Sequence, residues 1–458
     1  MRMTPDLRGQ KVVVFGLGKS GLGSVRLLAA KGAKVTGLDA RTFAQLGPTA
    51  SELKALGAEL ALGPTPEGLL ESADLVVVSP GVPLSLPELK RAKDKGVRIW
   101  GEVELAYRFL PEGVPFIGIT GTNGKSTTTA LTGELFTQGG RNTFVGGNLG
   151  RPLTEAALCD KPFDAHVVEL SSFQLEGIDS LRAHAAAILN LTPDHVDRYP
   201  SHEAYGEAKA RIFQNQREGD FAVVNADDAH VMRLARGSRG KVYGFSLRDG
   251  PVPEGLAGLA VPVSGGFRFT FGEGARLLLR SRSLRGEHNL QNAMAAALLA
   301  HLSGVDAPSI QRGLDSYPGL AHRLEYVRTL NGVEWINDSK ATNVDSTLVA
   351  LKAFPANVWL IAGGRGKGTP YEPMVQASMG RVKGVLTVGE DAPTVEAAYR
   401  GRIAVHACGT LERAVERARE LAKEGDVVLL SPACASYDQF KNFEHRGETF
   451  KRLVGALS

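Results

Sequence analysis

Residues 114–127 read VPFIGITGTNGKST, and this stretch decides the fold class of the chain's centre. An apolar run typical of a strand leads into a Gly-rich loop, and a helix is predicted from Lys125. The strict P-loop pattern GxxxxGK[ST] is not met, because Ile119 stands where its first glycine is required. What remains is GxxGKS between a strand and a helix, the context in which such loops bind nucleotides.

The chemistry of this loop predicts an ATP site with Mg²⁺. Backbone N–H groups can wrap the phosphate oxygens, and the Lys125 ammonium can reach the β and γ phosphates. The Ser126 or Thr127 hydroxyl can hold Mg²⁺. The candidate ATP-binding residues of the loop are Gly121, Thr122, Asn123, Gly124, Lys125, Ser126 and Thr127.

A second Gly-rich loop lies near the start of the chain. Residues 16–21 (GLGKSG) fit GxGxxG, follow a predicted strand at 11–16 and open a predicted helix at 20–31. Asp39 ends the next strand, near the usual position of the acidic residue that binds a ribose hydroxyl in NAD enzymes. A UDP-sugar also carries a pyrophosphate, so the motif indicates a diphosphate at a helix N-terminus. A mere tight turn is the alternative.

Two polar groups downstream are candidate metal ligands, and a lysine that follows them is not. Glu169 ends the apolar run HVVEL, and a carboxylate at the end of a parallel strand suits Mg²⁺. A solvated strand end is the alternative. His195 lies in the polar loop NLTPDHVD among carboxylates, which favours a ligand role. Lys209, among mixed charges on a predicted helix, is interpreted as a solvated lysine on these grounds alone.

The chain alternates strands with helices, which predicts parallel sheets with helices on both faces. Residues 244–287 predict a small antiparallel patch, and an Ala/Leu-rich helix follows at 289–303. The α/β rhythm restarts in the last third. Predicted strands there are 333–336, 357–362, 383–388 and 426–431, with an amphipathic helix at 411–423.

Composition limits the classes of function. The 458 residues suggest about three domains, and a net charge of +4 is too small to indicate nucleic-acid binding. Cys159, Cys408 and Cys434 lie far apart, which supports neither a zinc site nor a disulfide framework. The N-terminus lacks a signal-peptide pattern, and no apolar stretch is long enough to span a membrane. We therefore expect a cytoplasmic protein without a membrane span.

Six motifs together resemble the Mur ligase family over essentially the whole chain. They are GITGTNGKST, VVELSSFQLE, ILNLTPDHVDRY, GEHNLQNAMAA, INDSKATN and SPACASYDQFKNFEHRG. The resemblance implies an α/β fold of three domains. These are a Rossmann-like N-terminal domain (1–103) for the UDP-substrate, a central P-loop ATPase-like parallel-sheet domain (104–319) and a Rossmann-like C-terminal domain (320–458) for the amino acid.

The last two motifs are similar to those of the members that add D-glutamate to UDP-N-acetylmuramoyl-L-alanine in peptidoglycan synthesis. That activity implies ATP as co-substrate, two Mg²⁺ ions and an acyl-phosphate intermediate, which the amine of D-glutamate attacks. We expect a monomer that closes its domains around the nucleotide, because candidate ATP contacts come from two domains.

The resemblance also implies roles for individual residues. Glu169, His195 and Ser126 match metal ligands, and Lys209 matches a lysine that the family carbamylates into a further ligand. The UDP-substrate contacts implied are Gly18, Lys19, Ser20, Asp39, Arg41, Gly81, Asn148 and His195. Further ATP contacts implied are Asn289, Asn292, Arg323, Asp338 and Lys340. The D-glutamate pocket implied comprises Thr342, Lys367, Ser436 and Phe443. Lys19 replaces an apolar residue common in relatives.

Three alternatives remain at this point. An NAD-dependent oxidoreductase accounts for residues 11–39 and little else. A non-catalytic nucleotide-binding regulator does not need the P-loop lysine together with candidate metal ligands. A ligase adding another amino acid conflicts with the INDSKATN and SPACASYDQF segments.

Overall fold

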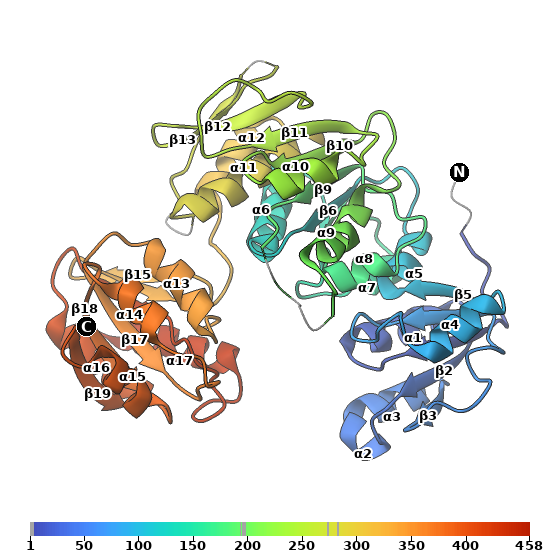
Figure 1. Cartoon of the computed structure of the whole chain (residues 1–458), viewed down its shortest axis with the longest axis horizontal. Helices are drawn as coiled ribbons and strands as arrows, with labels where there is room; N and C mark the ends of the chain where they lie inside the picture. Colours follow the sequence, from blue (N-terminus) through green and yellow to red (C-terminus); the bar gives the residue numbers. More distant parts are fainter. Residues whose placement is uncertain (1–3, 193, 195–197, 273, 282–283) are drawn as a thin grey trace. The chain divides into compact units, whose positions relative to one another are not determined.

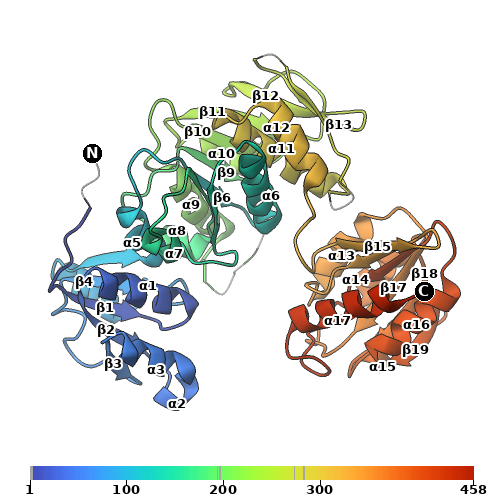
Figure 2. The same cartoon turned by 180° about the vertical axis from the view of Figure 1, so that it is seen from behind.

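The computed structural model describes residues 4–192, 194, 198–272, 274–281 and 284–458. The chain forms two compact units, which Figures 1 and 2 show from opposite sides. The first comprises Met1–Leu279 and Gln291–Leu314, and the second comprises Arg280–Leu290 and Asp315–Ser458. Each unit is built around parallel strands, as the alternation of strands and helices predicted.

A five-stranded parallel sheet in the order β3-β2-β1-β4-β5 begins the first unit. Its strands are β1 (Lys11–Phe15), β2 (Lys34–Asp39), β3 (Glu59–Leu62), β4 (Leu75–Val78) and β5 (Arg98–Gly101). Its helices are α1 (Lys19–Ala30), α2 (Phe43–Leu46), α3 (Pro48–Ala55), α4 (Pro87–Asp94) and α5 (Glu102–Phe109). The strand order reverses at β1, and ligands of such sheets bind beyond the strand ends at this point.

A nine-stranded sheet forms the rest of the first unit, in the order β14-β13-β12-β11-β10-β9-β6-β8-β7. Its strands are β6 (Phe116–Thr120), β7 (Thr143–Gly147), β8 (Ala165–Glu169), β9 (Ala185–Ile188), β10 (Phe221–Asn225), β11 (Lys241–Phe245), β12 (Gly258–Val263), β13 (Gly266–Phe269) and β14 (Arg276–Leu278). β12, β13 and β14 pair antiparallel, within the predicted patch, and all other pairs are parallel.

The helices after β6 begin with α6 (Lys125–Gln138), at the residue predicted. They continue with α7 (Thr154–Leu158), α8 (Ser172–Glu176), α9 (His202–Ala210), the 3-10 helix η1 (Arg211–Phe213), α10 (Ala229–Ala235), α11 (Glu287–Leu302) and α12 (Ala307–Ser316). Helix α11 starts in the second unit and continues into the first.

The second unit holds a six-stranded sheet in the order β15-β16-β20-β17-β18-β19. Its strands are β15 (Glu325–Leu330), β16 (Val333–Asn337), β17 (Val358–Gly363), β18 (Val382–Val388), β19 (Ala404–Gly409) and β20 (Val427–Leu430). Its helices are α13 (Val344–Lys352), α14 (Glu372–Ser378), α15 (Ala392–Tyr399), α16 (Leu411–Leu421) and α17 (Phe443–Ala456). Only β15 is antiparallel, at the sheet edge.

The central strands are apolar because helices cover both faces of the sheets. β6 (FIGIT) and β17 (VWLIAG) are buried at every position, as expected for parallel strands. The predicted α/β class with three parallel-rich sheets is confirmed. Among the described residues, no helix is long and apolar enough to cross a membrane.

The two sheets of the first unit are joined by a close contact at the end of β5. Gly101 N donates to Gly177 O at 2.8 Å, and a Cβ at Gly101 would lie 3.2 Å from Gly177 Cα. Gln174 Nε2 donates to the buried Glu102 Oε1 at 2.8 Å. The fully buried Glu104 accepts hydrogen bonds from three consecutive backbone N–H groups, 179–181, at 2.9–3.0 Å. These bonds join the end of β5 and the start of α5 to residues 174–181 of the P-loop domain.

Candidate active site

The P-loop begins α6 in a conformation that requires glycine. Gly124 precedes α6 with φ +83°, in the left-handed region that other residues rarely adopt. A Cβ there would lie 2.3 Å from Asn292 Oδ1. The same oxygen accepts a hydrogen bond from Thr128 Oγ1 at 3.2 Å. Asn292, predicted to contact nucleotide, therefore supports the P-loop from α11.

The next strand of the sheet holds the other side of this loop. Asn190 follows β9, and its backbone O accepts from Thr122 N at 3.1 Å. Its side chain accepts from Asn123 N at 2.8 Å and donates to Asn123 O at 3.1 Å. The sequence motifs predict no role for Asn190, although an amide beside a phosphate loop is a recognisable signal.

Two lysines meet on one carbonyl at the centre of the loop. Lys125 Nζ donates to Gly121 O at 3.0 Å and to Thr122 O at 2.9 Å. Lys209 Nζ, from the last turn of α9, also donates to Gly121 O, at 2.9 Å. Lys209 is 1% exposed and lies 4.5 Å from the centre of the Tyr205 ring.

Burial, with the positive charge of Lys125 as the next cause, lowers the pKa of Lys209 to about 7. An amine with this pKa is largely neutral in mildly alkaline solution, and a neutral amine is a nucleophile. Lys209 is therefore wrongly interpreted as a solvated side chain from charge pattern alone. The correction has a physical reason: α9 packs this lysine beneath the P-loop.

A carboxylate is aimed at the same place from β8. Glu169 ends β8, which pairs with β6 so that Glu169 lies opposite Ile119. Glu169 is 2% exposed, and its Oε1 accepts from Asn148 Nδ2 at 2.7 Å. Its Oε2 is buried and has no hydrogen-bond partner among the described residues. A buried carboxylate oxygen left in this way fits a Mg²⁺ ligand.

The structure describes some of the remaining predicted metal ligands and not others. Ser126 and Thr127 lie in the first turn of α6, beside Lys125, with Thr127 buried. His195 lies outside the described residues. Asp194 is described, and its charge acts on Lys209 to raise the lysine's pKa against the effect of burial. Oxygen donors thus lie at the loop, on β8 and beyond β9.

The first Gly-rich loop is held by Asp39. Asp39 Oδ2 accepts from Leu17 N at 2.7 Å, and both carboxylate oxygens pair with the Arg41 guanidinium at 2.8 and 2.9 Å. Arg41 holds the pKa of Asp39 down at about 2. Asp39 is 7% exposed, so it orients the loop and Arg41, whose side chain is 47% exposed.

The other predicted UDP-substrate contacts surround this loop. Gly18 is exposed immediately before α1, and Gly16 has φ +90°. Lys19 Nζ donates a short hydrogen bond to Gly150 O, three residues from β7. The exposed Gly81 follows β4, while Ser20 lies in the first turn of α1. The N-terminus of α1 thus opens towards solvent at the topological switch point.

In the second unit, the predicted ATP contacts lie near the buried Asp338. Asp338 is 5% exposed, and it accepts from Ser431 Oγ at 2.7 Å and from Leu324 N at 3.2 Å. Burial raises the pKa of Asp338 to about 7, against the lowering effect of the nearby Arg323 charge. Lys340 Nζ lies 5.9 Å from the Phe443 ring centre.

The predicted amino-acid pocket is spread over several loops of this unit. Ser436 is buried after β20, Thr342 is half-buried before α13, and Lys367 is exposed after β17. Asn289 is buried and donates to Arg285 O at 2.9 Å, within the part of α11 that belongs to the second unit. The structure thus brings Lys340 and Phe443 together, and it pairs Arg365, two residues before the exposed Lys367, with Ala435, the neighbour of Ser436.

Arg446 is a structural residue that the sequence did not single out. It is 2% exposed and donates to Ser339 Oγ at 3.0 Å, Ser339 O at 2.9 Å and Cys434 O at 3.1 Å. Ser339 Oγ in turn donates to Phe443 O at 2.8 Å. This buried guanidinium ties together the segments that carry Lys340, Ser436 and Phe443, although none of its contacts is local in sequence.

Comparison with known proteins gives matches along nearly the whole chain. Three family models match: the Mur ligase MurD-like N-terminal domain at 10–101, the Mur ligase middle domain at 119–300 and the Mur ligase glutamate ligase domain at 322–434. The UDP-N-acetylmuramoylalanine–D-glutamate ligase of Myxococcus xanthus is 67% identical, covering 99% of this chain and 100% of that protein. The enzyme of the same name from Anaeromyxobacter dehalogenans is 53% identical, covering 98% of each chain.

Solved structures resemble this one in fold. The UDP-N-acetylmuramate–alanine ligase of Thermotoga maritima aligns with a TM-score of 0.59 and 18% identity, over 98% of this chain and 99% of that one. A pseudomurein peptide ligase type C from Methanothermus fervidus aligns with a TM-score of 0.56 and 20% identity, over 98% and 100%. At these identities the likeness extends to the fold alone.

Proposed function

Because this chain belongs to the Mur ligase family, we propose that it joins D-glutamate to UDP-N-acetylmuramoyl-L-alanine, with ATP converted to ADP and phosphate. The full-length identity to ligases named for this reaction supports the choice of substrates. The observation that carries the chemistry is the P-loop before α6 with Lys125, Lys209 and the Glu169 oxygen that has no hydrogen-bond partner among the described residues. The alternative of an NAD-dependent oxidoreductase does not account for this arrangement.

The residues of the P-loop bind and orient the phosphates. The loop N–H groups and the start of α6 supply a partial positive charge, and Lys125 exchanges its two carbonyl partners for phosphate oxygens. The substrate carboxylate then attacks the γ-phosphate to give an acyl phosphate, and the amine of D-glutamate displaces phosphate. Lys125 stabilises the charge on the transferring group, so the chain acts by positioning and electrostatics.

Glu169 and the hydroxyl of Ser126 would hold Mg²⁺ beside these phosphates. Oε2 of Glu169 is the donor that favours this, because it is buried without a partner among the described residues and Asn148 fixes the other oxygen. When bound, Mg²⁺ supplies positive charge that neutralises the transferring phosphoryl group. His195 is proposed as a ligand of a second ion.

We also propose that Lys209 is carbamylated. Two ammonium groups on one carbonyl oxygen repel each other, and burial already favours the neutral amine of Lys209. Its nitrogen can then bond to the carbon of CO₂ and release a proton, giving a carbamate anion. The carbamate would pair with Lys125 in place of the repulsion and offer oxygen donors to a metal ion.

We assign the substrates to the remaining sites from the resemblance to the Mur ligase family. The UDP-substrate binds at the first Gly-rich loop through Gly18, Lys19, Ser20, Asp39, Arg41 and Gly81, with Asn148 beyond it. Asn289, Asn292, Arg323, Asp338 and Lys340 contact ATP, and Thr342, Lys367, Ser436 and Phe443 form the D-glutamate pocket. We further propose that the chain has three functional domains, at 1–103, 104–319 and 320–458. We also propose that the protein is a monomer and that it is cytoplasmic.

Phosphate release tests this function. The protein is supplied with ATP, Mg²⁺ and UDP-N-acetylmuramoyl-L-alanine, and amino acids are added one at a time. Release that depends on D-glutamate, and not on L-glutamate, L-lysine or diaminopimelate, supports both reaction and specificity. Release with another amino acid would retain the ligase and refute the assignment of the D-glutamate pocket. No release with any amino acid would refute the ligase itself.

A further inference from the structure

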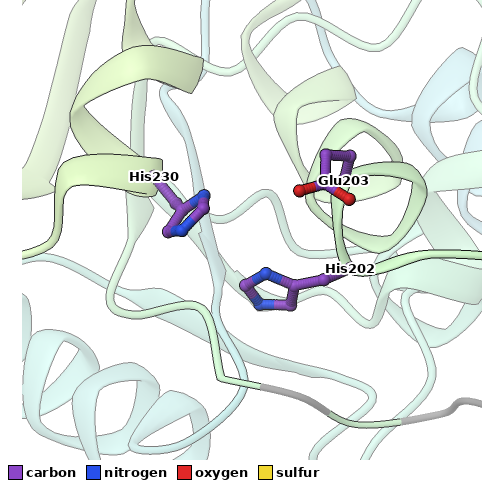
Figure 3. A group of neighbouring side chains, drawn as sticks. All are labelled: His202, Glu203 and His230. Carbon is purple, nitrogen blue, oxygen red and sulfur yellow. The ribbon is translucent and has the colours of Figure 1, made fainter.

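A cluster of imidazole and carboxylate groups lies at the starts of α9 and α10 in the first unit and includes none of the P-loop residues. His202, Glu203 and His230 each offer a donor atom, and these atoms lie within 4.8 Å of one another. Among the described residues this is the only such group of three or more His, Cys, Asp or Glu. Figure 3 shows the three side chains converging on one space from two neighbouring helices.

Helix capping places the donors. Ser201 Oγ accepts from Ala204 N at 3.2 Å, so α9 begins at His202 and puts His202 and Glu203 in its first turn. Asp228 caps α10 in the same way and accepts from His230 N at 3.0 Å. All three candidate ligands are therefore held at the starts of short, well-capped helices.

Close packing of α9 on α10 brings the two helix starts together. Gly206 of α9 has no side chain to separate the helices, and a Cβ there would lie 3.2 Å from Leu234 Cδ1 of α10. As a result, the rings of His202 and His230 lie with their centres 5.1 Å apart and nearly perpendicular. The donors are thus brought together by the packing of the backbone.

One buried nitrogen of the His202 ring has no hydrogen-bond partner among the described residues. His202 Nε2 is buried, and no described residue hydrogen-bonds to it. An unsatisfied buried polar atom destabilises the folded state, so an imidazole nitrogen in this position favours a ligand.

We propose that His202, Glu203 and His230 form a second metal site that takes a divalent transition cation such as Zn²⁺. Two imidazoles and one carboxylate suit Zn²⁺, Co²⁺ or Ni²⁺, whereas Mg²⁺ prefers oxygen donors alone. Tetrahedral donors at about 2.1 Å from Zn²⁺ lie roughly 3.4 Å apart, which small rotations of these side chains reach. Water would complete the coordination.

Such an ion would join α9 to α10. Because α9 also carries Lys209 in its last turn, the ion would stiffen the helix that places this lysine beneath the P-loop. The inference rests on the cluster itself and does not depend on the proposed ligase activity.

The test measures Zn²⁺ binding by the full-length, tag-free protein in competition with a chromophoric chelator. Excess Mg²⁺ is present throughout, so that oxygen-rich sites such as Glu169 are occupied. The variants are His230→Asn and Glu203→Gln, with His445→Asn as the control, since His445 is an exposed histidine on α17 outside the cluster. Visible absorption of bound Co²⁺ reports the coordination geometry independently.

We expect one competed Zn²⁺ per chain for the wild type and for His445→Asn. His230→Asn and Glu203→Gln should each weaken binding by at least about tenfold, because even residues that only orient a metal ligand contribute about 10- to 100-fold to affinity. The Co²⁺ bands should disappear in the same two variants. Glu203 is exposed, so Glu203→Gln carries the test if His230→Asn fails to fold.

The proposal is overturned if the wild type does not compete for Zn²⁺ in excess Mg²⁺. It is equally overturned if all three variants bind as the wild type does, or if His445→Asn alone loses binding. Unchanged binding in all three variants would mean an adventitious ion only.

Discussion

Replacing Lys209 with methionine should make the protein more stable at low pH while abolishing ligation. Lys209 titrates near pH 7 in the folded protein, against 10.5 for an exposed lysine, because burial disfavours its charge. That difference corresponds to roughly 5 kcal/mol by which the protonated lysine destabilises the folded state. Methionine has a similar length and no charge, so it removes this cost.

The variant also loses two favourable contacts. The hydrogen bond from Lys209 to Gly121 O contributes about 1 kcal/mol, and the contact with the Tyr205 ring about 1–2 kcal/mol. The net gain in unfolding free energy at pH 6 is therefore about 2–3 kcal/mol. Because the unfolded chain binds more protons between pH 7 and 10.5, wild-type stability rises across this range. The advantage of the variant should vanish as the pH approaches 10.5.

Urea denaturation at pH 6, 8 and 10 in CO₂-free buffer measures this effect. Lys90→Met, an exposed position on α4, serves as the matched control and should change stability by no more than about 0.5 kcal/mol at each pH. Adding bicarbonate should raise the stability of the wild type but not of Lys209→Met, since only the lysine forms a carbamate. A stability difference that does not vary with pH would refute the reasoning.

Three further predictions concern other parts of the protein. Lys125→Ala should lower the ligation rate by about 100- to 1,000-fold in a phosphate-release assay with little change in melting temperature, and a normal rate would contradict its role. Glu104→Gln should cost about 3 kcal/mol or more in urea unfolding, because an amide cannot accept from all of residues 179–181, and a loss under 1 kcal/mol would contradict it. Lys367→Ala should raise the KM for D-glutamate and leave the KM for ATP unchanged, whereas the reverse pattern would move Lys367 out of the amino-acid pocket.

Sequence patterns predict the local features of this protein well. The start of α6 at Lys125, the strand that ends at Asp39 and the buried strands β16, β17, β18 and β20 all follow from apolar runs and glycine spacing. The same patterns do not predict the edge strands β15 and β19. Their residues are mostly half-buried or exposed, so their apolar pattern is weaker than that of the central strands.

By itself, the sequence determined where a phosphate loop and a second Gly-rich loop lie, because both depend on glycines and a helix start within a few residues. Only the tertiary structure decided how Lys209 is used. Lys209 and Gly121 are 88 residues apart, and their contact requires α9 to pack beneath the P-loop. Likewise, the support of Gly124 by Asn292 and the burial of Glu169 arise from packing between distant segments. Burial and electrostatic environment are properties of that packing, and no local pattern contains them.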